Sequence, residues 1–479
     1  MKKIKILFFV ALSFSFFGCS DWLQLELQNS ISKETFWKSE ADVEAAVNST
    51  FIALRSQVKT MFWWGELRGD FLQVGENAGG DVKRILALQI VDDNGLSNWT
   101  GMYTVINLAN SVLKNAPATR EYDASFLEED MNAYMAEAYF VRSLVYFYLV
   151  RTFHEVPLVL EPSENDDVDF FLGKSSEETI LNQIIEDLVW AEQYAKRDFG
   201  SLSLNKGRGS QSAIQALLAD VYLWAEKYDE CLVMCDKIIS RSAHALMTPD
   251  ETKDFSEQAF YDDIFDEGGN SLEGVFEIQY SEVKSQPNPF FDFLIKEPEV
   301  LISDTGFEAF EDINDEERGM GVSFDEETLE ITKMYLGGSS TNWIVYRYAD
   351  ILLMKAEALV QQGASLKAQK LLNKVRERAG LGGKIVPGDK ATAEDMILSE
   401  RALEFAFEGK RWFDLLRVAK RNNFERKQML IDKLVENAPA ADRDLWESKL
   451  SDPMSYFMPI YYKELRNNIN LKQNPYYEH

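Results

Sequence analysis

The feature that most constrains the fold is an apolar pattern of helical period that is interrupted once and then resumes, and it occurs twice. In residues 211–241, apolar side chains recur every three or four positions on both sides of a break near residues 226–229. Residues 348–378 repeat this design around a break at residues 363–365. Such a period is typical of an amphipathic helix. Each stretch is therefore predicted to form two antiparallel helices joined by a short turn.

The two predicted hairpins also share their internal spacing. In both, offsets of 12 and 16 residues separate a small residue of the first helix from two inward-facing residues of the second: Ala219 from Cys231 and Cys235, and Ala356 from Ala368 and Leu372. The length of each unit is that of a tetratricopeptide repeat, and such units bury their apolar faces by stacking. Unrelated hairpins of an all-α protein are the alternative. Because the two cysteines share one helix face, they are predicted to be buried thiols.

The same periodicity predicts two more helix pairs, residues 40–55 with 101–114 and residues 132–153 with 177–197. The block from residue 245 to residue 341 breaks the pattern. It is rich in Gly, Pro, Asp and aromatic residues and includes a strand-like segment at its Gly274-to-Tyr280 stretch. We therefore predict a mostly α fold, in which tetratricopeptide-like helix pairs pack against an irregular, loop-rich half with short strands. Long ordered loops on a rigid frame are common positions for binding residues.

The N-terminus has the pattern of a bacterial export signal. Lysines at positions 2, 3 and 5 precede an apolar run from Ile6 to Phe17, and Gly18 and Cys19 follow it. The run is too short to span a bilayer, and Gly18-Cys19 resembles a lipobox, where cleavage leaves a cysteine that carries lipid. We predict a signal peptide over residues 1–18, lipid attachment at Cys19 and a single domain over residues 19–479. An ordinary secretory signal with a chance cysteine is the alternative.

The charge of the chain restricts its partners. The formal net charge is −29 at pH 7 and becomes −32 when the three lysines of the signal are removed. A polyanion repels nucleic acid and acidic membrane surfaces. The charge therefore favours a neutral ligand and argues against nucleic acid as a partner.

The sequence offers few of the residues and motifs that enzymes commonly use for catalysis. The sequence contains three histidines, His154, His244 and His479, and lacks the motifs of serine hydrolases, nucleotide-binding proteins and zinc proteases. Residues 262–273 have the length of an EF-hand loop, but Ile264 and Glu267 occupy its third position and its invariant glycine position. A glycosidase needs two carboxylates at a set separation, and no pair stands out among 79 acidic residues. We predict a protein that is not an enzyme and holds no metal or cofactor; a glycosidase is the unfavoured alternative, and calcium held by loops of another design stays open.

Aromatic residues provide the positive signal for function. The chain has 10 Trp, 19 Tyr and 31 Phe. An aromatic ring can cover the flat C–H face of a sugar while carboxylates, amides and arginines hydrogen-bond the hydroxyl groups. Aromatic residues in predicted helices are assigned to packing. Aromatic residues in predicted loops, together with three polar residues, are the candidates for glycan binding: Tyr280, Phe290, Phe291, Trp343, Asp81, Arg84 and Asn94.

The order of several short motifs resembles the SusD/RagB family of surface lipoproteins of Bacteroidetes nutrient-uptake systems. After Cys19 these motifs are Asp21-Trp22-Leu23, GELRGD at 65–70, WTGMY at 99–103, AEAYFVR at 136–142, RYADILLMKAEA at 347–358, EGKRWFDLLR at 408–417 and FMPI at 457–460. We interpret most of these residues as scaffold. Arg347 and Asp350 flank the start of a buried helix, and an ion-pair network between helices is predicted for Glu400, Arg401, Glu404, Arg411 and Arg417.

The resemblance implies a lid-like role over a SusC-type, TonB-dependent transporter, with glycan as the usual ligand and no cofactor. It also implies a lipid-anchored location in the outer membrane, facing the cell surface. Ligand sites in the family are loop-borne and variable, so no ligand residue is carried across. The alternative is a peptide- or protein-binding subunit of the same kind of complex. Aromatic loops favour sugar, whereas a groove lined by Asn, Arg and Lys favours peptide.

Overall fold

The computed structural model describes residues 36–164, 168–248, 260–265 and 268–478. The predicted signal peptide and the predicted lipid attachment at Cys19 lie outside these residues. Within them, no helix combines the length and the apolar character needed to cross a membrane.

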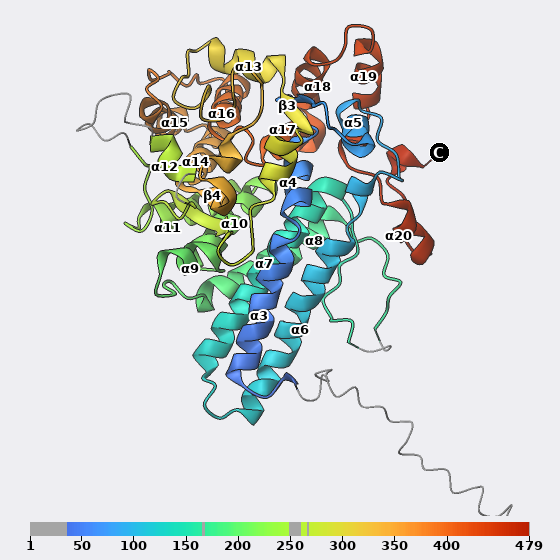
Figure 1. Cartoon of the computed structure of the whole chain (residues 1–479), viewed down its shortest axis with the longest axis vertical. Coiled ribbons are helices and arrows are strands. Elements are labelled where there is room, and N and C mark those ends of the chain that lie inside the picture. Colours follow the sequence, from blue (N-terminus) through green and yellow to red (C-terminus); the bar gives the residue numbers. More distant parts are fainter. Residues whose placement is uncertain (1–35, 165–167, 249–259, 266–267, 479) are drawn as a thin grey trace, which may run out of the picture.

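The N-terminal helices form the first part of a stack. α3 (Glu40–Arg55) packs along α6 (Thr100–Tyr122), and α7 (Glu128–Phe153) packs against both α6 and α8 (Glu177–Tyr194). Figure 1 shows α3, α6 and α7 as long neighbouring columns in the lower half of the molecule. Every residue from 140 to 153 of α7 is buried, because neighbours cover this part of the helix on all sides. These packings confirm both predicted helix pairs.

The two predicted hairpins are also confirmed. α10 (Gln211–Trp224) packs on α11 (Tyr228–Ile239), and α14 (Tyr348–Gln361) packs on α15 (Ser365–Arg378). α8 contacts α10, and α11 contacts α14. The helices therefore form one continuous stack from α3 to α15, as expected for units that bury their apolar faces against each other.

Small features of the sequence set the ends and the inner face of these hairpins. The chain reverses at Glu226 and at Gly363, whose φ angles are 59° and 74°. A residue in this left-handed region commonly ends a helix. Cys231 and Cys235 are buried free thiols on one face of α11, as predicted.

Shorter helices and turns surround this stack. In the described residues they are α4 (Val58–Glu66), α5 (Gly80–Leu86), η3 (Gly95–Ser97), α9 (Leu202–Gly207), α12 (Phe260–Phe265), η5 (Phe291–Lys296), α13 (Asp304–Glu311), η6 (Lys333–Tyr335), η7 (Gly338–Ser340), α16 (Lys390–Glu404), α17 (Arg411–Phe424), α18 (Lys427–Glu436), α19 (Arg443–Leu450), η8 (Pro453–Tyr456), α20 (Tyr462–Asn467) and η9 (Pro475–Tyr477).

Two short antiparallel ribbons join distant parts of the chain. β1 (Leu72–Val74) pairs with β3 (Val300–Ile302), and β2 (Gly274–Ile278) pairs with β4 (Trp343–Arg347). β2 confirms the predicted strand, and the described residues of the block from residue 245 to residue 341 are mostly irregular, as predicted. Within that block, however, α13 is a helix where the composition predicted loops and strands. Its start is capped by the Ser303 hydroxyl, which accepts from the backbone N–H of Gly306.

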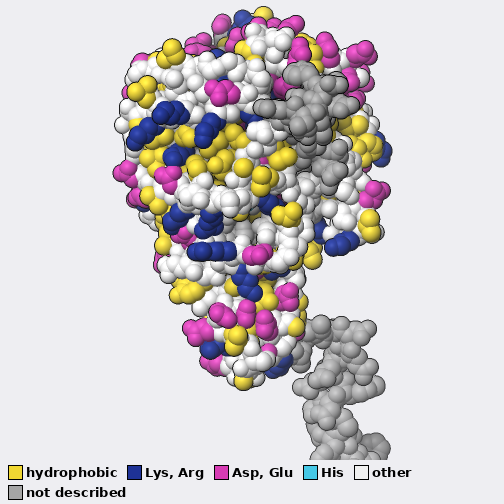
Figure 2. Space-filling view, turned by 90° about the vertical axis from the view of Figure 1, so that its left-hand side faces the viewer, with side chains coloured by type: hydrophobic (Ala, Val, Ile, Leu, Met, Phe, Trp, Pro, Cys, Tyr) yellow, Lys and Arg dark blue, Asp and Glu magenta, His cyan; other side chains and the backbone are white. Residues whose placement is uncertain are grey.

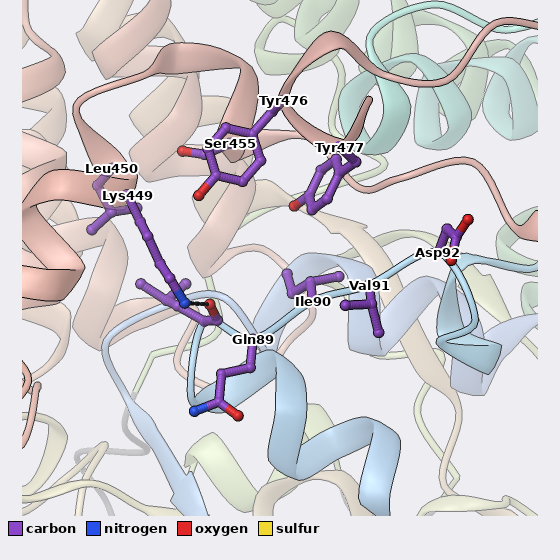
Figure 3. A pocket seen from close by; sticks show the side chains of 10 residues that line it. Gln89, Ile90, Val91, Asp92, Lys449, Leu450, Ser455, Tyr476 and Tyr477 are labelled. Carbon is purple, nitrogen blue, oxygen red and sulfur yellow. Dashed lines mark hydrogen bonds between the residues drawn. The ribbon is translucent and has the colours of Figure 1, made fainter. Parts of the chain in front are cut away.

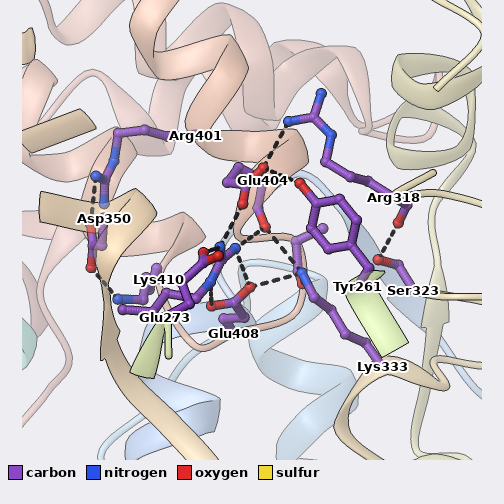
Figure 4. A network of polar contacts seen from close by, with 12 residues as sticks. Tyr261, Glu273, Arg318, Ser323, Lys333, Asp350, Arg401, Glu404, Glu408 and Lys410 are labelled. Atoms are coloured by element: carbon purple, nitrogen blue, oxygen red, sulfur yellow. Dashed lines mark hydrogen bonds and ion pairs between the residues drawn. The ribbon is translucent and has the colours of Figure 1, made fainter. Parts of the chain in front are cut away.

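A buried network of charged side chains ties the last helices to the second ribbon (Figure 4). The guanidinium of Arg347 is fully buried and pairs with Glu273 at 2.6 Å, Glu404 at 2.5 Å and Glu408 at 2.9 Å. Arg318 also pairs with Glu404, at 3.0 Å. Buried charges are tolerated when they are paired and hydrogen-bonded, and a group left without its partner is costly.

Neighbouring pairs extend this network through α14, α16 and α17. Arg401 pairs with Asp350 at 2.7 Å and with Asp414 at 2.9 Å. Arg417 pairs with Glu357 at 2.8 Å, and Arg411 with Asp70 at 2.5 Å. These pairs confirm the predicted ion-pair network.

The network predicts a loss of stability in acid. Burial raises the pKa of Glu357, but Arg417 and Arg421 outweigh burial and lower this pKa from 4.5 to about 2. A carboxylate whose pKa is lower in the folded state than in the unfolded state stabilises the fold. This stabilisation is complete above the unfolded-state pKa and is lost as the pH falls through the folded-state pKa. Between pH 4.5 and pH 2, we expect Glu357 to account for a loss of about 3 kcal/mol. Urea denaturation at pH 7 and pH 3 should show a smaller acid loss for Glu357→Gln than for the unchanged protein; an equal loss would contradict this assignment.

Candidate functional site

Three of the four predicted aromatic residues belong to the core, and Trp343 and Phe290 lie deepest in it. Trp343 is 1% exposed, and Phe290 is fully buried. The Phe290 ring centroid lies 5.0 Å from that of Phe62, 5.4 Å from that of Phe293 and 6.4 Å from that of Trp343. Neither ring has a face open to solvent. Their burial favours packing over the predicted ligand contact.

Tyr280 is also a buried core residue, with 9% of it exposed, but it borders a cavity, whereas Phe291 is half-buried. Tyr280 lines a cavity of about 630 Å³ together with Arg55 of α3, and Phe291 is not part of this lining. The Tyr280 hydroxyl has no hydrogen-bond partner among the described residues. Phe291 is half-buried against Tyr335, with ring centroids 4.7 Å apart. The structure therefore does not bring the four aromatic candidates together around one cavity.

The three polar candidates brace one loop. Arg84 pairs with Asp81 at 2.5 Å and with Asp93 at 3.3 Å. Asp81 also accepts from the backbone N–H of Gly95 at 2.9 Å, and the buried Asn94 donates from Nδ2 to the carbonyl of Asp81 at 3.1 Å. These bonds hold the segment after α5, residues 87–98, against that helix. The first part of this segment borders the cavities described next.

Two cavities meet at the turn formed by Leu88 and Gln89, which lines both of them. The first cavity has a volume of about 570 Å³ and lies between residues 88–92 and the C-terminal segment. The second has a volume of about 700 Å³ and lies among α5, the start of α13 and the α18–α19 segment. We call the two cavities together the groove. Figure 1 shows α5, α18, α19 and the C-terminus on one side of the molecule.

The turn between the two cavities has an uncommon backbone conformation. Leu88 has a φ of 49°, in the left-handed region that residues other than glycine rarely adopt. Lys449 of α19 donates from Nζ to the carbonyl of Leu88 at 2.7 Å, and Figure 3 shows its long side chain reaching the turn. This bond ties α19 to the turn, so it helps set the width of the groove. Backbone strain of this kind is found at functional sites more often than elsewhere.

The lining of the groove combines partly exposed aromatic rings with hydrogen-bonding groups. Trp446, Tyr476 and Tyr477 supply the rings. Burial raises the pKa of Tyr477, so its hydroxyl stays protonated at neutral pH and can donate a hydrogen bond. Amides, carboxylates and a guanidinium line the second cavity: Gln73, Gln89, Asn437, Asp304, Glu308 and Arg443. A sugar-binding site needs aromatic rings that cover the C–H faces of the sugar and polar groups that hydrogen-bond its hydroxyl groups. The groove offers both.

The aromatic residues of the groove were missed from the sequence alone. Trp446 stands in the polar segment ADRDLWESK at 441–449, where a single large ring among charged neighbours could have marked an exposed aromatic residue. Tyr476 and Tyr477 follow Pro475 near the C-terminus, beyond the FMPI motif at 457–460. No local signal links these residues to Leu88, because the fold alone brings them together.

The two histidines that the structure describes lie outside the groove, and the described residues contain no cluster of metal ligands. In that part of the chain, no group of three or more His, Cys, Asp or Glu residues could hold a metal. Burial and the nearby Lys206 lower the pKa of His244 to about 4, so this imidazole is neutral at pH 7, and its Nδ1 lies 3.0 Å from the carbonyl oxygen of Gly274. Neither His244 nor His154 lines the groove.

The stacked helix pairs and the polar, aromatic groove define a helical-repeat binding protein. A family model described as the SusD family matches residues 328–477, and a second model, described as starch-binding associating with outer membrane, matches residues 24–223. The chain belongs to the SusD/RagB family, as its motifs predicted.

Relatives and solved structures agree with this assignment. The chain is 26% and 27% identical to two SusD-like proteins of Formosa agariphila, over 99% of this chain and 99% of each relative. A SusD superfamily protein from Bacteroides vulgatus has a TM-score of 0.76 at 22% identity, covering 92% of this chain and 100% of that one. A laminarin binding SusD-like protein has a TM-score of 0.72 at 21% identity, covering 91% of this chain and 99% of that one. The structural likeness confirms the predicted fold.

Proposed function

We propose that this protein captures oligosaccharide or polysaccharide and delivers it to a SusC-type, TonB-dependent transporter of the outer membrane. The observation that carries the proposal is the groove, where Trp446, Tyr476 and Tyr477 offer rings beside amide, carboxylate and guanidinium groups. A laminarin binding relative of the same fold and the starch-binding description of one family model support a sugar as the ligand.

The side chains of the groove favour ligand binding without catalysis. The carboxylates that line the groove, Asp92, Asp304, Glu308, Glu436 and Asp442, are all exposed to solvent, whereas the general acid of a glycosidase is typically kept protonated by apolar surroundings. A glycosidase needs one carboxyl group that is kept protonated. We therefore propose that the protein is not an enzyme.

A binding panel tests the proposed function. Protein that begins after Cys19 should bind at least one class of oligosaccharide in isothermal titration or on a glycan array. The same mixture should release no reducing ends above a buffer control. Turnover that is lost on substitution of a single carboxylate would assign an enzyme instead. Binding to peptides and to no glycan would favour the peptide-binding alternative.

We also propose that residues 1–18 are a signal peptide, that Cys19 carries the lipid anchor, and that residues 19–479 form one domain facing the cell surface. The description of one family model as associating with outer membrane supports this location. Cys19→Ala removes the thiol that would carry the lipid, so it should leave unprocessed precursor or release the protein from membranes. Fractionation and intact mass measure both outcomes. Unchanged mass and membrane association in this variant would refute the anchor.

The face opposite the groove offers support for a protein partner. Figure 2 shows hydrophobic side chains gathered in one area of this face, with Lys and Arg around it. Helices on this side of the molecule carry exposed apolar residues, among them Leu202 of α9, Val233 of α11 and Leu366 of α15. Exposed apolar areas with a charged border are typical of protein interaction surfaces. We assign the transporter contact to this face.

The peptide-binding alternative rests on the cavity next to Tyr280. Its lining includes Asn48, Arg55, Lys284 and Gln286, the residue types that favour peptide over sugar because they bond the peptide backbone. A panel of short peptides separates the two functions. Peptide binding that is weakened by Tyr280→Ala and unaffected by substitution of Trp446 would place a peptide in this cavity.

A further inference from the structure

A second aromatic surface lies beyond the groove. A cavity of about 520 Å³ opens among the start of α6, residues 157–163, residues 168–172 and the last turn of α20, and we call it the α20 cavity. Phe170 and Phe171 line it and are 54% and 48% exposed. Two adjacent phenyl rings left half in water are costly unless something covers them, because each ring buries a large apolar area on contact.

The backbone that carries these rings is held in place. The side-chain amide of Asn470 donates to the carbonyl of Phe171 at 2.6 Å, and that of Asn468 donates to the carbonyl of Leu172 at 2.8 Å. The carboxylate of Asp169 accepts from the backbone N–H of Phe171 at 2.8 Å. These bonds fasten the segment to the residues after α20. The backbone that carries both rings is therefore fixed by hydrogen bonds, which reduces the conformational entropy lost when a ligand covers the rings.

The polar groups around the rings suit hydroxyl groups. Asn107 accepts at Oδ1 from the backbone N–H of Ser163 at 2.7 Å, and its NH₂ group bonds none of the described residues, so it can donate to a ligand. Thr104 and Asn467 also line the cavity, and none of the described residues that line it is a lysine or an arginine. This lining lacks the cations that an anionic ligand requires. The carboxylates of Asp169 and Glu464 line the cavity as well and can accept hydrogen bonds from hydroxyl groups. Aromatic rings beside hydroxyl, amide and carboxylate groups favour a sugar without negative charge.

The short helix α20 links the α20 cavity to a residue that lines the groove. The backbone N–H of Tyr462, the first residue of α20, donates to the carbonyl of Asp92 at 2.9 Å, and Asp92 lines the groove. Glu464 and Asn467 of the same short helix line the α20 cavity. In Figure 1, α20 lies next to the C-terminus, on the same side as α5 and α19. A ligand that follows the surface of α20 can therefore occupy both.

We propose that the α20 cavity is a second glycan subsite, which binds sugar residues of the same chain that occupies the groove, with Phe170 and Phe171 as its stacking rings. This inference rests on the proposed function. It makes the protein selective for long chains, because the second contact of a tethered ligand forms at a high effective concentration. A short oligosaccharide fills the groove alone, whereas a polysaccharide gains both contacts.

The double variant Phe170→Ala/Phe171→Ala tests the subsite. A stacked ring contributes a factor of about 2 to 10 in affinity, so the variant should bind a polysaccharide at least about fivefold more weakly. Its affinity for a short oligosaccharide of the same glycan should stay unchanged in isothermal titration. Both rings are exposed, so the melting temperature should also stay unchanged. Tyr122→Ala is the matched control, because Tyr122 is 72% exposed at the far end of α6.

The outcomes separate this subsite from the proposed function. If no glycan of any length binds the unchanged protein, the proposed function fails. If short and long chains bind the double variant as tightly as the unchanged protein, only the subsite is refuted. An equal loss for both lengths would place the rings in the primary site instead. Weaker association with a transporter and unchanged glycan affinity would assign the rings to a protein contact, which also overturns the subsite.

Discussion

Arg347→Met is expected to destabilise the protein by at least about 3–5 kcal/mol, the largest effect that we predict. The fully buried guanidinium faces Glu273, Glu404 and Glu408 at 2.5–2.9 Å. Methionine keeps much of the side-chain volume and removes the charge, so three buried carboxylates lose their shared partner. Breaking a buried pair by removing one member costs about 3–5 kcal/mol, a large fraction of the net stability of a typical protein. Urea or thermal denaturation measures the loss.

Lys355→Met provides the control for this prediction. Lys355 pairs with Asp236, whose side chain is 60% exposed, and exposed pairs are worth about 0–1 kcal/mol. The control should therefore melt close to the unchanged protein. A loss below about 1 kcal/mol for Arg347→Met would mean that the network does not hold the second ribbon to the last helices.

Trp446→Ala and Tyr476→Ala are expected to weaken glycan binding by about 2- to 10-fold each, and the double variant by more than tenfold. Each ring lines a different cavity of the groove, Trp446 the second and Tyr476 the first. A stacked ring contributes about 0.5–1.5 kcal/mol beyond its buried area. Both side chains are partly exposed, so their truncation should leave the melting temperature nearly unchanged. Isothermal titration and thermal denaturation are to be measured on each variant.

Phe290→Ala serves as the opposite control. Phe290 is fully buried, and truncation of a core phenylalanine costs about 3–5 kcal/mol of stability. It should lower the melting temperature, while the folded fraction binds glycan as before. Unchanged affinity in both groove variants, or a loss of affinity confined to Phe290→Ala, would remove the groove as the glycan site.

The sequence alone determined the scaffold. Helical periodicity in residues 211–241 and 348–378 predicted α10, α11, α14 and α15, because a helix that packs on one side must place apolar residues every three to four positions. Charged residues in the family-like motifs, such as Arg401 and Glu404, were interpreted as an ion-pair network between helices, and the structure shows these pairs to be buried. The helix prediction depends on local spacing and the ion-pair interpretation on the motifs that resemble the family, and both are confirmed.

Only the tertiary structure decided where a ligand can bind. Loop composition placed Trp343 among the candidates, yet its pairing in β4 with β2 buries the ring. The turn at Leu88 meets Trp446 and Tyr476, more than 350 residues further along the chain, because α19 packs beside this turn and Lys449 bonds its carbonyl. Exposure of a ring depends on which distant segments cover it. The hydrophobic periodicity of a helix or strand indicates which of its faces is buried. It does not indicate which distant segments come together at the surface.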